Sequence, residues 1–208
     1  MPTVYYPYHM PPRMYRIGRF TMSETEVKQI AKSWAAISLA FAIVYARGSP
    51  ASMLFVMFAV SAFTVGLGFI FHELSHKVAA QRYGCFAEYR GNDRMLWLAV
   101  IMAFAGFVFA APGAVMIAGP VDWRRNGIIS AAGPAANLVI AGLFYGLSLL
   151  SGGFLGFVFS LGYQINGWLA LFNLIPFMNL DGKKILYWNK SVYFALAFIG
   201  VFFSFILG

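Results

Sequence analysis

Charged side chains are scarce in this sequence: Asp, Glu, Lys and Arg make up only 11% of its 208 residues. Hydrophobic residues make up 61%. Soluble domains are about a quarter charged and about half apolar, so the composition excludes an ordinary soluble domain. We therefore expect one membrane-embedded domain over residues 1–208, in contact with the lipid bilayer along most of its length.

Cysteine, histidine and acidic residues are also rare. The single Cys85 excludes an internal disulfide bond, and the chain has three histidines and seven acidic residues. Lys and Arg together number 15, which gives a net charge of +8. A basic balance can indicate nucleic-acid binding, but no basic region outside the apolar segments is large enough to form a domain. We expect no nucleic-acid partner, because basic residues in a membrane protein mainly report its topology.

Long apolar runs organise the chain. They lie at residues 33–46, 51–75, 95–111, 127–149, 153–178 and 191–208. Several reach about 17 residues or more, the length that crosses a hydrocarbon core of roughly 30 Å. The pattern predicts an all-α polytopic membrane protein with five to six transmembrane helices. Residues 1–32 would form a cytoplasmic or interfacial tail, 33–182 the core, and 183–208 a basic loop and a final helix.

The basic residues favour five crossings over six. If the N-terminus is cytoplasmic and residues 95–111 enter the bilayer and return, every Lys and Arg except Arg47 lies on the cytoplasmic side. A true crossing would move all later basic residues outside, against the positive-inside rule. We therefore expect a re-entrant or interfacial, β-like element near residues 95–120, with a helix ending at Ala111-Pro112-Gly113 and an extended return. The N-terminus and the inner helix ends would be cytoplasmic in a multi-pass cell-membrane protein.

One apolar run carries two histidines and a glutamate, in the stretch HELSH at residues 72–76. On a helix, positions i and i+4 share a face, so His72 and His76 can bind one zinc ion while Glu73 reaches a water molecule on that ion. Zinc lowers the pKa of such a water to about 7, and Glu73 can take its proton and later pass it to the leaving amine. A purely structural role is the alternative, but ionisable groups inside membrane segments are costly and usually functional.

A catalytic zinc needs a third protein ligand and one open position. Three carboxylates lie beyond residue 88, namely Asp93, Asp122 and Asp181. Asp93 and Asp122 lie in charged, loop-like stretches, for which a solvated surface role is the default. Asp181 follows the apolar stretch FNLIPFMNL, and in the five-crossing topology it lies at the same depth as HELSH. Asp181 is therefore the candidate third ligand.

Two asparagines lie within apolar segments near the same depth. Asn173 precedes Asp181, with the helix-breaking Pro176 between them, and we expect it to steady the substrate or the oxyanion. Asn137 follows Gly133 in SAAGPAANL, where small residues allow helices to approach closely. For Asn137 a hydrogen bond between helices is the favoured interpretation, and a role at the site is the alternative.

Taken together, HELSH at 72–76, GPAAN at 133–137 and NLIPFMNLDG at 173–182 resemble the motifs of the site-2 protease family of intramembrane zinc metalloproteases. The motifs follow the family's order. The resemblance implies a zinc metalloendopeptidase with one Zn²⁺ per chain. It further implies His72, His76 and Asp181 as zinc ligands, Glu73 as the catalytic base, and Asn173 as a polar neighbour of the site.

The same resemblance implies substrates that are single-span membrane proteins, cleaved within the bilayer to release a regulatory domain. The family holds an unwound substrate against an edge strand, and Gly113, Ala114, Val115 and Met116 fit that strand because an extended return is expected there. Adding a strand to a sheet edge would keep the substrate backbone open. No stretch is long enough for the PDZ or CBS domains of some relatives, so substrate selection is expected to rest on the membrane part or on a partner.

The main alternative is a zinc-binding membrane protein without proteolysis, such as a transporter or a chaperone-like protein. Transporters usually contain paired repeats, and none is visible here. The intact Glu73 also argues for catalysis, because binding alone would not need it. The family pattern is altered at Ser75, where many members have glycine, and at Lys183-Lys184, but neither change affects a predicted ligand. The minimal chain favours a prokaryotic membrane, and the oligomeric state stays open.

Overall fold

The structure, a computed structural model, describes residues 13–18, 20–108, 112–178 and 180–207. The helices are α1 Glu24–Tyr45, α2 Ser52–Phe63, α3 Val65–Arg82, α4 Asp93–Phe104, α5 Trp123–Leu149, α6 Gly153–Leu174, α7 Asp181–Trp188 and α8 Lys190–Val201, which a π-helical turn, Phe202–Ile206, continues. The strands are β1 Met14–Ile17, β2 Phe20–Ser23, β3 Phe86–Gly91 and β4 Gly113–Ala118. The strands form two antiparallel pairs, β1 with β2 and β3 with β4.

Four helical segments of the described chain are long and apolar enough to cross a membrane. They are α1, the joined α2–α3 segment Ser52–Arg82, α5 and α6. The apolar helix Lys190–Ile206 is shorter than these. The structure therefore supports a mostly α-helical, polytopic membrane protein, whereas the expected number of five to six crossings is not confirmed.

Polar N-caps decide where several helices begin. The Ser23 hydroxyl accepts a hydrogen bond from the backbone N–H of Glu26 at 3.1 Å, and the side chains of Asn92 and Asp122 cap α4 and α5 in the same way. Such caps satisfy backbone N–H groups that have no partner inside the helix. Helix α1 consequently begins at Glu24, so residues 24–32, expected in the N-terminal tail, are helical.

The segment between β3 and β4 leaves the sheet and returns to it at one end. Helix α4 has 12 residues and is about 18 Å long, which is short of the roughly 30 Å of a hydrocarbon core. The register pairs Gly91 with Gly113, so the chain leaves and re-enters the sheet at adjacent points. This is the geometry of a returning segment, and β4 is the extended strand expected after Pro112.

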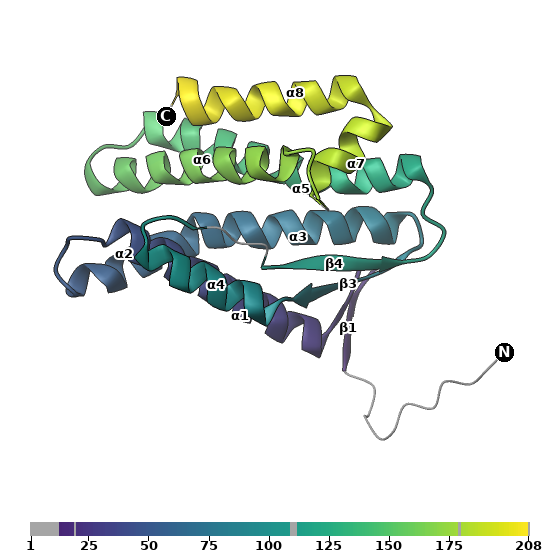
Figure 1. Ribbon diagram of the computed structural model, residues 1–208, viewed down its shortest axis with the longest axis horizontal. Coiled ribbons are helices and arrows are strands. Elements are labelled where there is room, and N and C mark those ends of the chain that lie inside the picture. Colours follow the sequence, from purple (N-terminus) through teal and green to yellow (C-terminus); the bar gives the residue numbers. More distant parts are fainter. Residues whose placement is uncertain (1–12, 19, 109–111, 179, 208) are drawn as a thin grey trace.

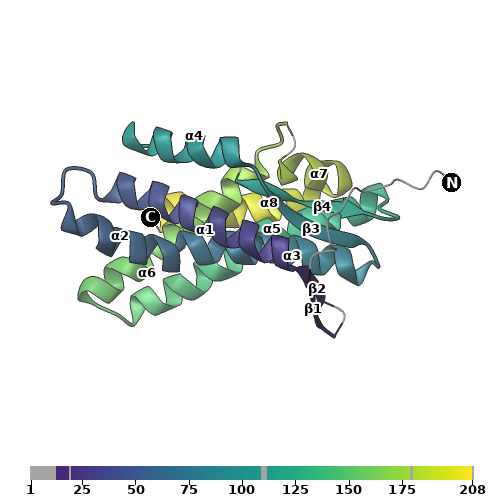
Figure 2. The ribbon, with the colours of Figure 1, turned by 90° about the horizontal axis from the view of Figure 1, so that it is seen from below.

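Helix α4 ends earlier than the sequence indicated. Its last residue is Phe104, and Gly106 follows with φ +96°, a left-handed conformation that favours glycine and commonly ends helices. The expected last helical residue, Ala111, lies outside the described residues. Helix α4 packs against α1 at the periphery of the molecule (Figure 2). Its side chains Trp97, Ile101 and Phe104 are exposed.

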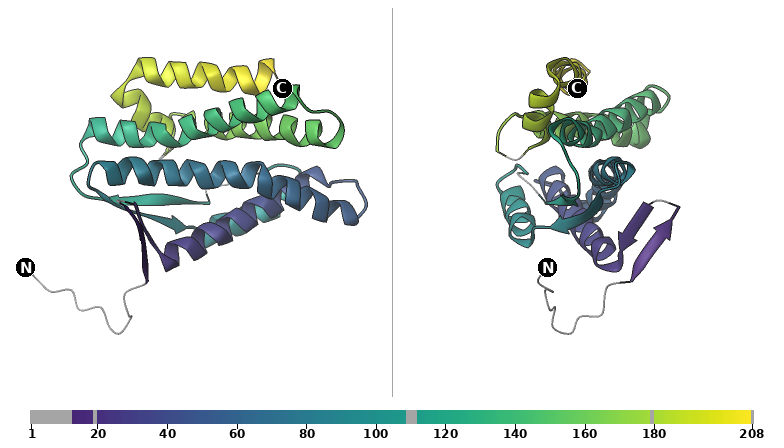
Figure 3. Two further views of the ribbon diagram at one scale, coloured as in Figure 1. Left: turned by 180° about the vertical axis from the view of Figure 1, so that it is seen from behind. Right: turned by 90° about the vertical axis from the view of Figure 1, so that its right-hand side faces the viewer.

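Helix α3 occupies the centre of the fold (Figure 1). Helices α5 and α6 lie on one side of it, and α1 with the β3–β4 sheet lies on the other (Figure 3). Strand β4 runs alongside α3, and Val115 of β4 packs against the buried core that contains Phe69 and Tyr89. The fold thus holds one helix between two structural layers, and that helix carries HELSH.

Candidate metal site

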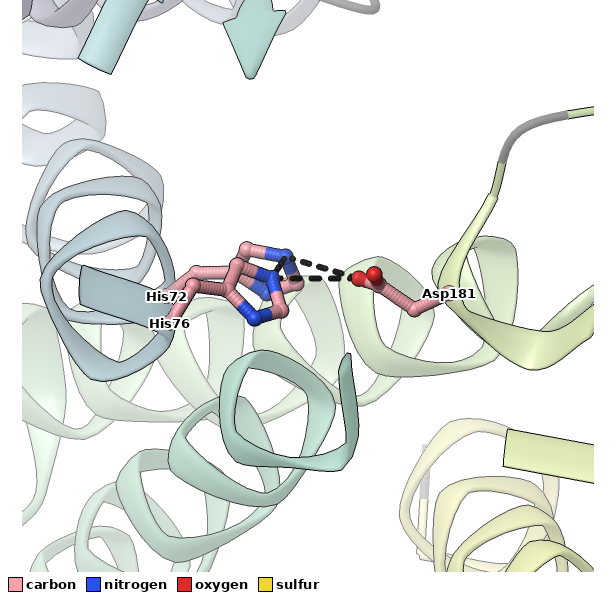
Figure 4. A group of neighbouring side chains, drawn as sticks. All are labelled: His72, His76 and Asp181. Atoms are coloured by element: carbon pink, nitrogen blue, oxygen red, sulfur yellow. Dashed lines mark hydrogen bonds and ion pairs between the residues drawn. The ribbon is translucent and has the colours of Figure 1, made fainter. Parts of the chain in front are cut away.

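Helix α3 and the start of α7 bring three side chains together (Figure 4). His72 and His76 lie one turn apart on the same face of α3, because i and i+4 residues share a helical face. Asp181 is the first residue of α7 and points at both rings from the opposite side. All three side chains are buried. The three residues expected as ligands are therefore neighbours in space, although Asp181 is more than a hundred residues away in the sequence.

The distances between the three ligand atoms suit a tetrahedral ion. The Nε2 atoms of His72 and His76 are 3.1 Å apart, and Asp181 Oδ2 is 3.5 Å from the first and 3.1 Å from the second. Zinc binds such atoms at about 2.0–2.1 Å, and the edge of a tetrahedron of that radius is about 3.3 Å. Two imidazoles and one carboxylate are also a ligand set that zinc uses in hydrolases. The residues fit the metal.

The hydrogen bonds of the two rings leave both Nε2 atoms without protons. His72 Nδ1 lies 2.5 Å from the side-chain oxygen of Asn137, and His76 Nδ1 lies 2.8 Å from the carbonyl oxygen of Ile129. Both oxygens accept only, so in the neutral rings each Nδ1 carries the proton. The two Nε2 lone pairs then converge with a carboxylate oxygen. Three acceptors this close repel one another unless a cation lies between them.

The orientation of Asn137 follows from its other contacts. Its amide nitrogen donates to the side-chain oxygen of Asn166 at 3.0 Å and to the carbonyl of Gly68 at 3.3 Å. These donor contacts assign the amide oxygen to His72. Asn137 thus holds the ring of His72 in its tautomer, which favours the hydrogen bond between helices over direct contact with a substrate.

Asn166 completes this polar network, and the sequence analysis missed it. Its amide nitrogen donates to the carbonyls of Gly162 at 2.8 Å and Thr64 at 3.4 Å, while its oxygen accepts from Asn137. Both asparagines are fully buried. The signal that could have revealed Asn166 is an asparagine in the middle of an apolar helix, since an amide at that depth needs partners from other helices.

Two glycines allow the helices to approach the ligands. A Cβ atom at Gly133 would collide with the imidazoles of His76 and His72, so α5 can lie against the metal site only with glycine there. A Cβ atom at Gly182 would collide with the backbone of Leu174, at the end of α6. The glycines of the GPAAN and LDG stretches therefore set how closely α5 and α7 approach their neighbours.

Glu73 is next to His72 in the sequence and does not belong to the group of three ligands. It is buried on α3, directly after His72, and its carboxylate interacts electrostatically with His72 and Asp181. A buried carboxyl that interacts with two of the three ligands suits a group that handles a proton near the metal.

The second carboxylate oxygen of Asp181 faces a lysine. Asp181 Oδ1 lies 3.8 Å from the ammonium of Lys184, while Oδ2 faces the histidines. A cation at this distance favours the ionised form of a carboxyl. Asp181 is therefore an anionic ligand candidate.

Asn173 is not joined to the metal ligands. Its amide nitrogen donates to the carbonyl of Leu169 at 2.9 Å, one turn earlier in α6, and no hydrogen bond to His72, His76 or Asp181 is found among the described residues. Its expected role near the substrate stays a prediction. The structure makes Gly113, Ala114, Val115 and Met116 the first four residues of β4.

The other two aspartates considered as ligands lie elsewhere. Asp93 is exposed and makes an ion pair with Lys32 of α1, and Asp122 caps α5. Neither belongs to the group that could hold a metal ion within the described ranges.

Comparisons with known proteins find two relatives that are named as zinc metalloproteases. A protein of Methanocaldococcus jannaschii named "Putative zinc metalloprotease MJ0611" is 35% identical over 178 residues, which cover 84% of this chain and 90% of the relative. A protein of Bacillus subtilis named "Putative zinc metalloprotease YwhC" is 31% identical over 143 residues, covering 59% of this chain and 65% of the relative. No model of a protein family matches the chain, and no solved structure matches it.

Proposed function

Because the chain belongs to a site-2 protease-like family of zinc metalloproteases, we propose that it is an intramembrane zinc endopeptidase. Its substrates would be single-span membrane proteins, cut within the membrane-spanning segment to release a regulatory domain. The whole chain would form one protease domain.

One observation carries the proposal. Three ligand atoms converge at a helix that belongs to an apolar segment of 31 residues, Ser52–Arg82. The same helix carries Glu73, directly after His72. A hydrolytic site for soluble substrates would not require that surrounding. Ionisable groups in such segments are costly and usually serve a function.

The chain's own residues support a hydrolytic mechanism. Zinc, when bound, would lower the pKa of a water molecule and polarise the scissile carbonyl. His72, His76 and Asp181 would hold the ion, with Asn137 and the Ile129 carbonyl orienting the two imidazoles. Glu73 would take a proton from water during attack and donate it to the leaving amine as the C–N bond breaks.

Strand β4 supports a way of presenting the substrate. A helical substrate hides its carbonyls in internal hydrogen bonds, so it must unwind before attack. Strand β4 lies alongside α3, and a peptide added to its edge would be held extended near the metal ligands. The residues Gly113 to Met116 would supply part of that edge.

The orientation in the membrane is also proposed. The basic residues favour a multi-pass cell-membrane protein with its N-terminus and the metal-bearing helix ends at the cytoplasmic side. Fusing a reporter to Arg13 or to the turn at Gly48 would test this. The turn is expected outside, together with Arg47, and a cytoplasmic turn would contradict the orientation.

The decisive experiment compares the purified wild type with Glu73→Gln on a panel of single-span membrane substrates, with zinc measured on the same samples. We expect cleavage within the span by the wild type only, a fall of about 10²–10⁴-fold in the variant, and one zinc per chain in both. The matched control is Glu24→Gln, the same change at a surface glutamate of α1. It should leave both readouts unchanged.

The outcomes separate the alternatives. Zinc in both proteins with no cleavage of any substrate would favour the non-proteolytic zinc protein, which the comparisons do not favour. Loss of zinc in Glu73→Gln would contradict its assignment as a base. Cleavage that survives a chelator, or that the variant retains, would contradict the proposed mechanism.

A further inference from the structure

A second buried polar cluster lies on the other side of α3. The Lys77 ammonium makes an ion pair with Glu26 Oε2 at 2.6 Å and donates to the carbonyl of Ala87 at 2.7 Å. The other oxygen of Glu26 accepts from the backbone N–H of Tyr89 at 2.9 Å. The side chains of Glu26 and Lys77 are 0% and 2% exposed. One ion pair thus connects α1, α3 and strand β3.

These contacts fall on one edge of β3. In antiparallel pairs, residues alternate between those whose backbone groups face the partner strand and those whose groups face away. The Asn92 N–H donates to the Pro112 carbonyl, so by the register Arg90 and Glu88 also face β4. The backbone groups of Ala87, Tyr89 and Gly91 therefore face away from β4.

Side chains cover that outer edge of β3. The Lys77 ammonium donates to the Ala87 carbonyl, and the Glu26 carboxylate accepts from the Tyr89 N–H. The Gln29 side-chain oxygen accepts from the Gly91 N–H at 2.8 Å. An edge strand normally offers such groups to any extended chain. These three bonds, and the side chains that make them, hinder the addition of another strand along this edge.

The outer edge of β4 is different. By the same register, the backbone groups of Gly113, Val115 and Ile117 face away from β3. No hydrogen bond to Val115 or Ile117 on that side is found in the part of the chain that the structure describes. The two-stranded sheet therefore has one closed edge and one open edge.

The cluster is not the simplest means of stabilising the fold. A buried ion pair can often be replaced by apolar residues of similar volume without loss of stability, because desolvation offsets the attraction. A charged pair that also bonds to a strand supplies direction, since its hydrogen bonds fix where the strand lies. Here they fix β3 relative to α3, the helix that carries the metal ligands.

We propose that Glu26 and Lys77, with Gln29, are positioning residues that hold the β3–β4 sheet at a fixed height beside the metal-bearing helix and leave only β4 open to a peptide. The proposal rests on the proposed function, because the peptide is the substrate of that site. Together Glu26, Lys77 and Gln29 form a clamp on β3. This clamp would decide which peptide bond of the extended substrate reaches the metal ligands. Because strand residues are spaced about 3.3 Å apart, a slip of one residue would bring a different bond to the site.

Two matched double variants test the clamp. Glu26→Leu/Lys77→Met and Glu26→Gln/Lys77→Met both remove the charges and the Lys77 bond to Ala87. They differ in one respect: the glutamine oxygen can still accept from the Tyr89 N–H, and leucine cannot. The first variant is the leucine pair and the second is the glutamine pair. If the cluster served stability alone, the leucine pair would be at least as stable and as active as the glutamine pair.

The readouts are zinc content, the cleaved bond identified by mass spectrometry, kcat and KM, and amide hydrogen exchange over residues 86–91. We expect both variants to fold and to bind zinc. The leucine pair should lower kcat about 10–100-fold, cut at displaced or several bonds and exchange faster over β3, because small misplacements far from the chemistry cost that much. The glutamine pair should stay closer to the wild type in all three.

Crosslinking gives the substrate register independently. Cys85 is the single cysteine, so Cys85→Ser with Met116→Cys leaves one thiol on β4. In the inactive Glu73→Gln background, this thiol should crosslink to one position of a cysteine-scanned substrate. In the leucine pair it should crosslink to several. An unchanged cleaved bond, unchanged crosslinks and unchanged exchange in the leucine pair would overturn the proposal.

Failure of the clamp and failure of the proposed function look different. If the wild type cleaves no substrate, the function fails, and exchange still decides the clamp: equal exchange in the two variants overturns it. If the leucine pair does not fold, Gln29→Leu replaces it, because this change frees only the Gly91 N–H. A faster exchange at β3 with a displaced cut supports the clamp in that variant, and wild-type behaviour overturns it.

Discussion

Helix α3 contributes to two buried polar clusters. His76 belongs to the first cluster, and the next residue, Lys77, belongs to the second. The first faces α5 and α7 and brings together two imidazole nitrogens and a carboxylate oxygen at 3.1–3.5 Å. The second faces α1 and β3 and places an ammonium 2.6 Å from a carboxylate and 2.7 Å from a carbonyl. Both clusters are shielded from water, so both are costly to assemble.

The difference lies in their donors and acceptors. In the first cluster every ring proton is directed outward, to Asn137 and Ile129, and only acceptors converge. It needs a cation from outside. In the second cluster donors and acceptors balance within the protein, and the cation is the ammonium of Lys77. A buried polar cluster is thus a candidate metal site when several of its lone pairs face one another without a donor. When each acceptor has a donor within the protein, the cluster connects structural elements instead.

The largest effect is expected from Asp181→Asn, which changes a predicted metal ligand in the first cluster. The variant keeps an oxygen near the histidines but loses the negative charge, so zinc affinity should fall by more than about 100-fold, beyond what the loss of an outer hydrogen-bond partner costs. Titration against a competing chelator measures it, and circular dichroism checks the fold. Full affinity would mean that another group is the third ligand.

Lys77→Met should disrupt the second cluster, and its main effect should be on stability rather than on zinc binding. It leaves the Glu26 carboxylate buried without its partner, which costs about 3–5 kcal/mol of stability. The molecules that remain folded should still bind zinc. The control is Lys28→Met, which removes the lysine of an exposed pair with Glu24 and should leave the stability nearly unchanged. Thermal unfolding in detergent with and without zinc separates the two effects.

Asn137→Ala should act on the metal through a ligand. Without its oxygen, the His72 ring loses the partner that fixes its tautomer, and zinc affinity should fall about 10–100-fold. Asn126→Ala, on the same helix α5, is the control. An unchanged affinity in Asn137→Ala would show that packing alone orients the ring.

The smallest effect is expected from Asn173→Ala. Its side chain bonds only to its own helix among the described residues, so zinc affinity should not change and stability should shift by no more than about 0.5 kcal/mol. A lower kcat/KM with intact zinc binding would support the predicted contact with the substrate. Loss of zinc would contradict the geometry described here.

Much of the site could be predicted from the sequence. Helical periodicity alone puts His72 and His76 on one face with Glu73 beside them, because that spacing is local. The choice of Asp181 needed a topology, and the charge distribution supplied one that brought it to the depth of HELSH. The extended return at Gly113 followed from the basic residues and from Pro112 in the same way.

Other features could not be predicted because they depend on which atoms meet across helices. The sequence does not show that α4 ends at Phe104, that Asn166 satisfies Asn137, or that Gly133 lies against the imidazoles. Nor does it show that Glu26 and Lys77 form a pair, since 51 residues separate them and both look like surface charges in a linear reading.

The sequence by itself determined the chemistry of this protein: the residue types, their local spacing and the apolar runs that bury them. The tertiary structure decided their partners. Local spacing is set by the geometry of the helix, whereas the partner of a buried polar group is set by packing between elements far apart in the chain. That packing makes one polar face of α3 a candidate metal site and the other a joint to the sheet.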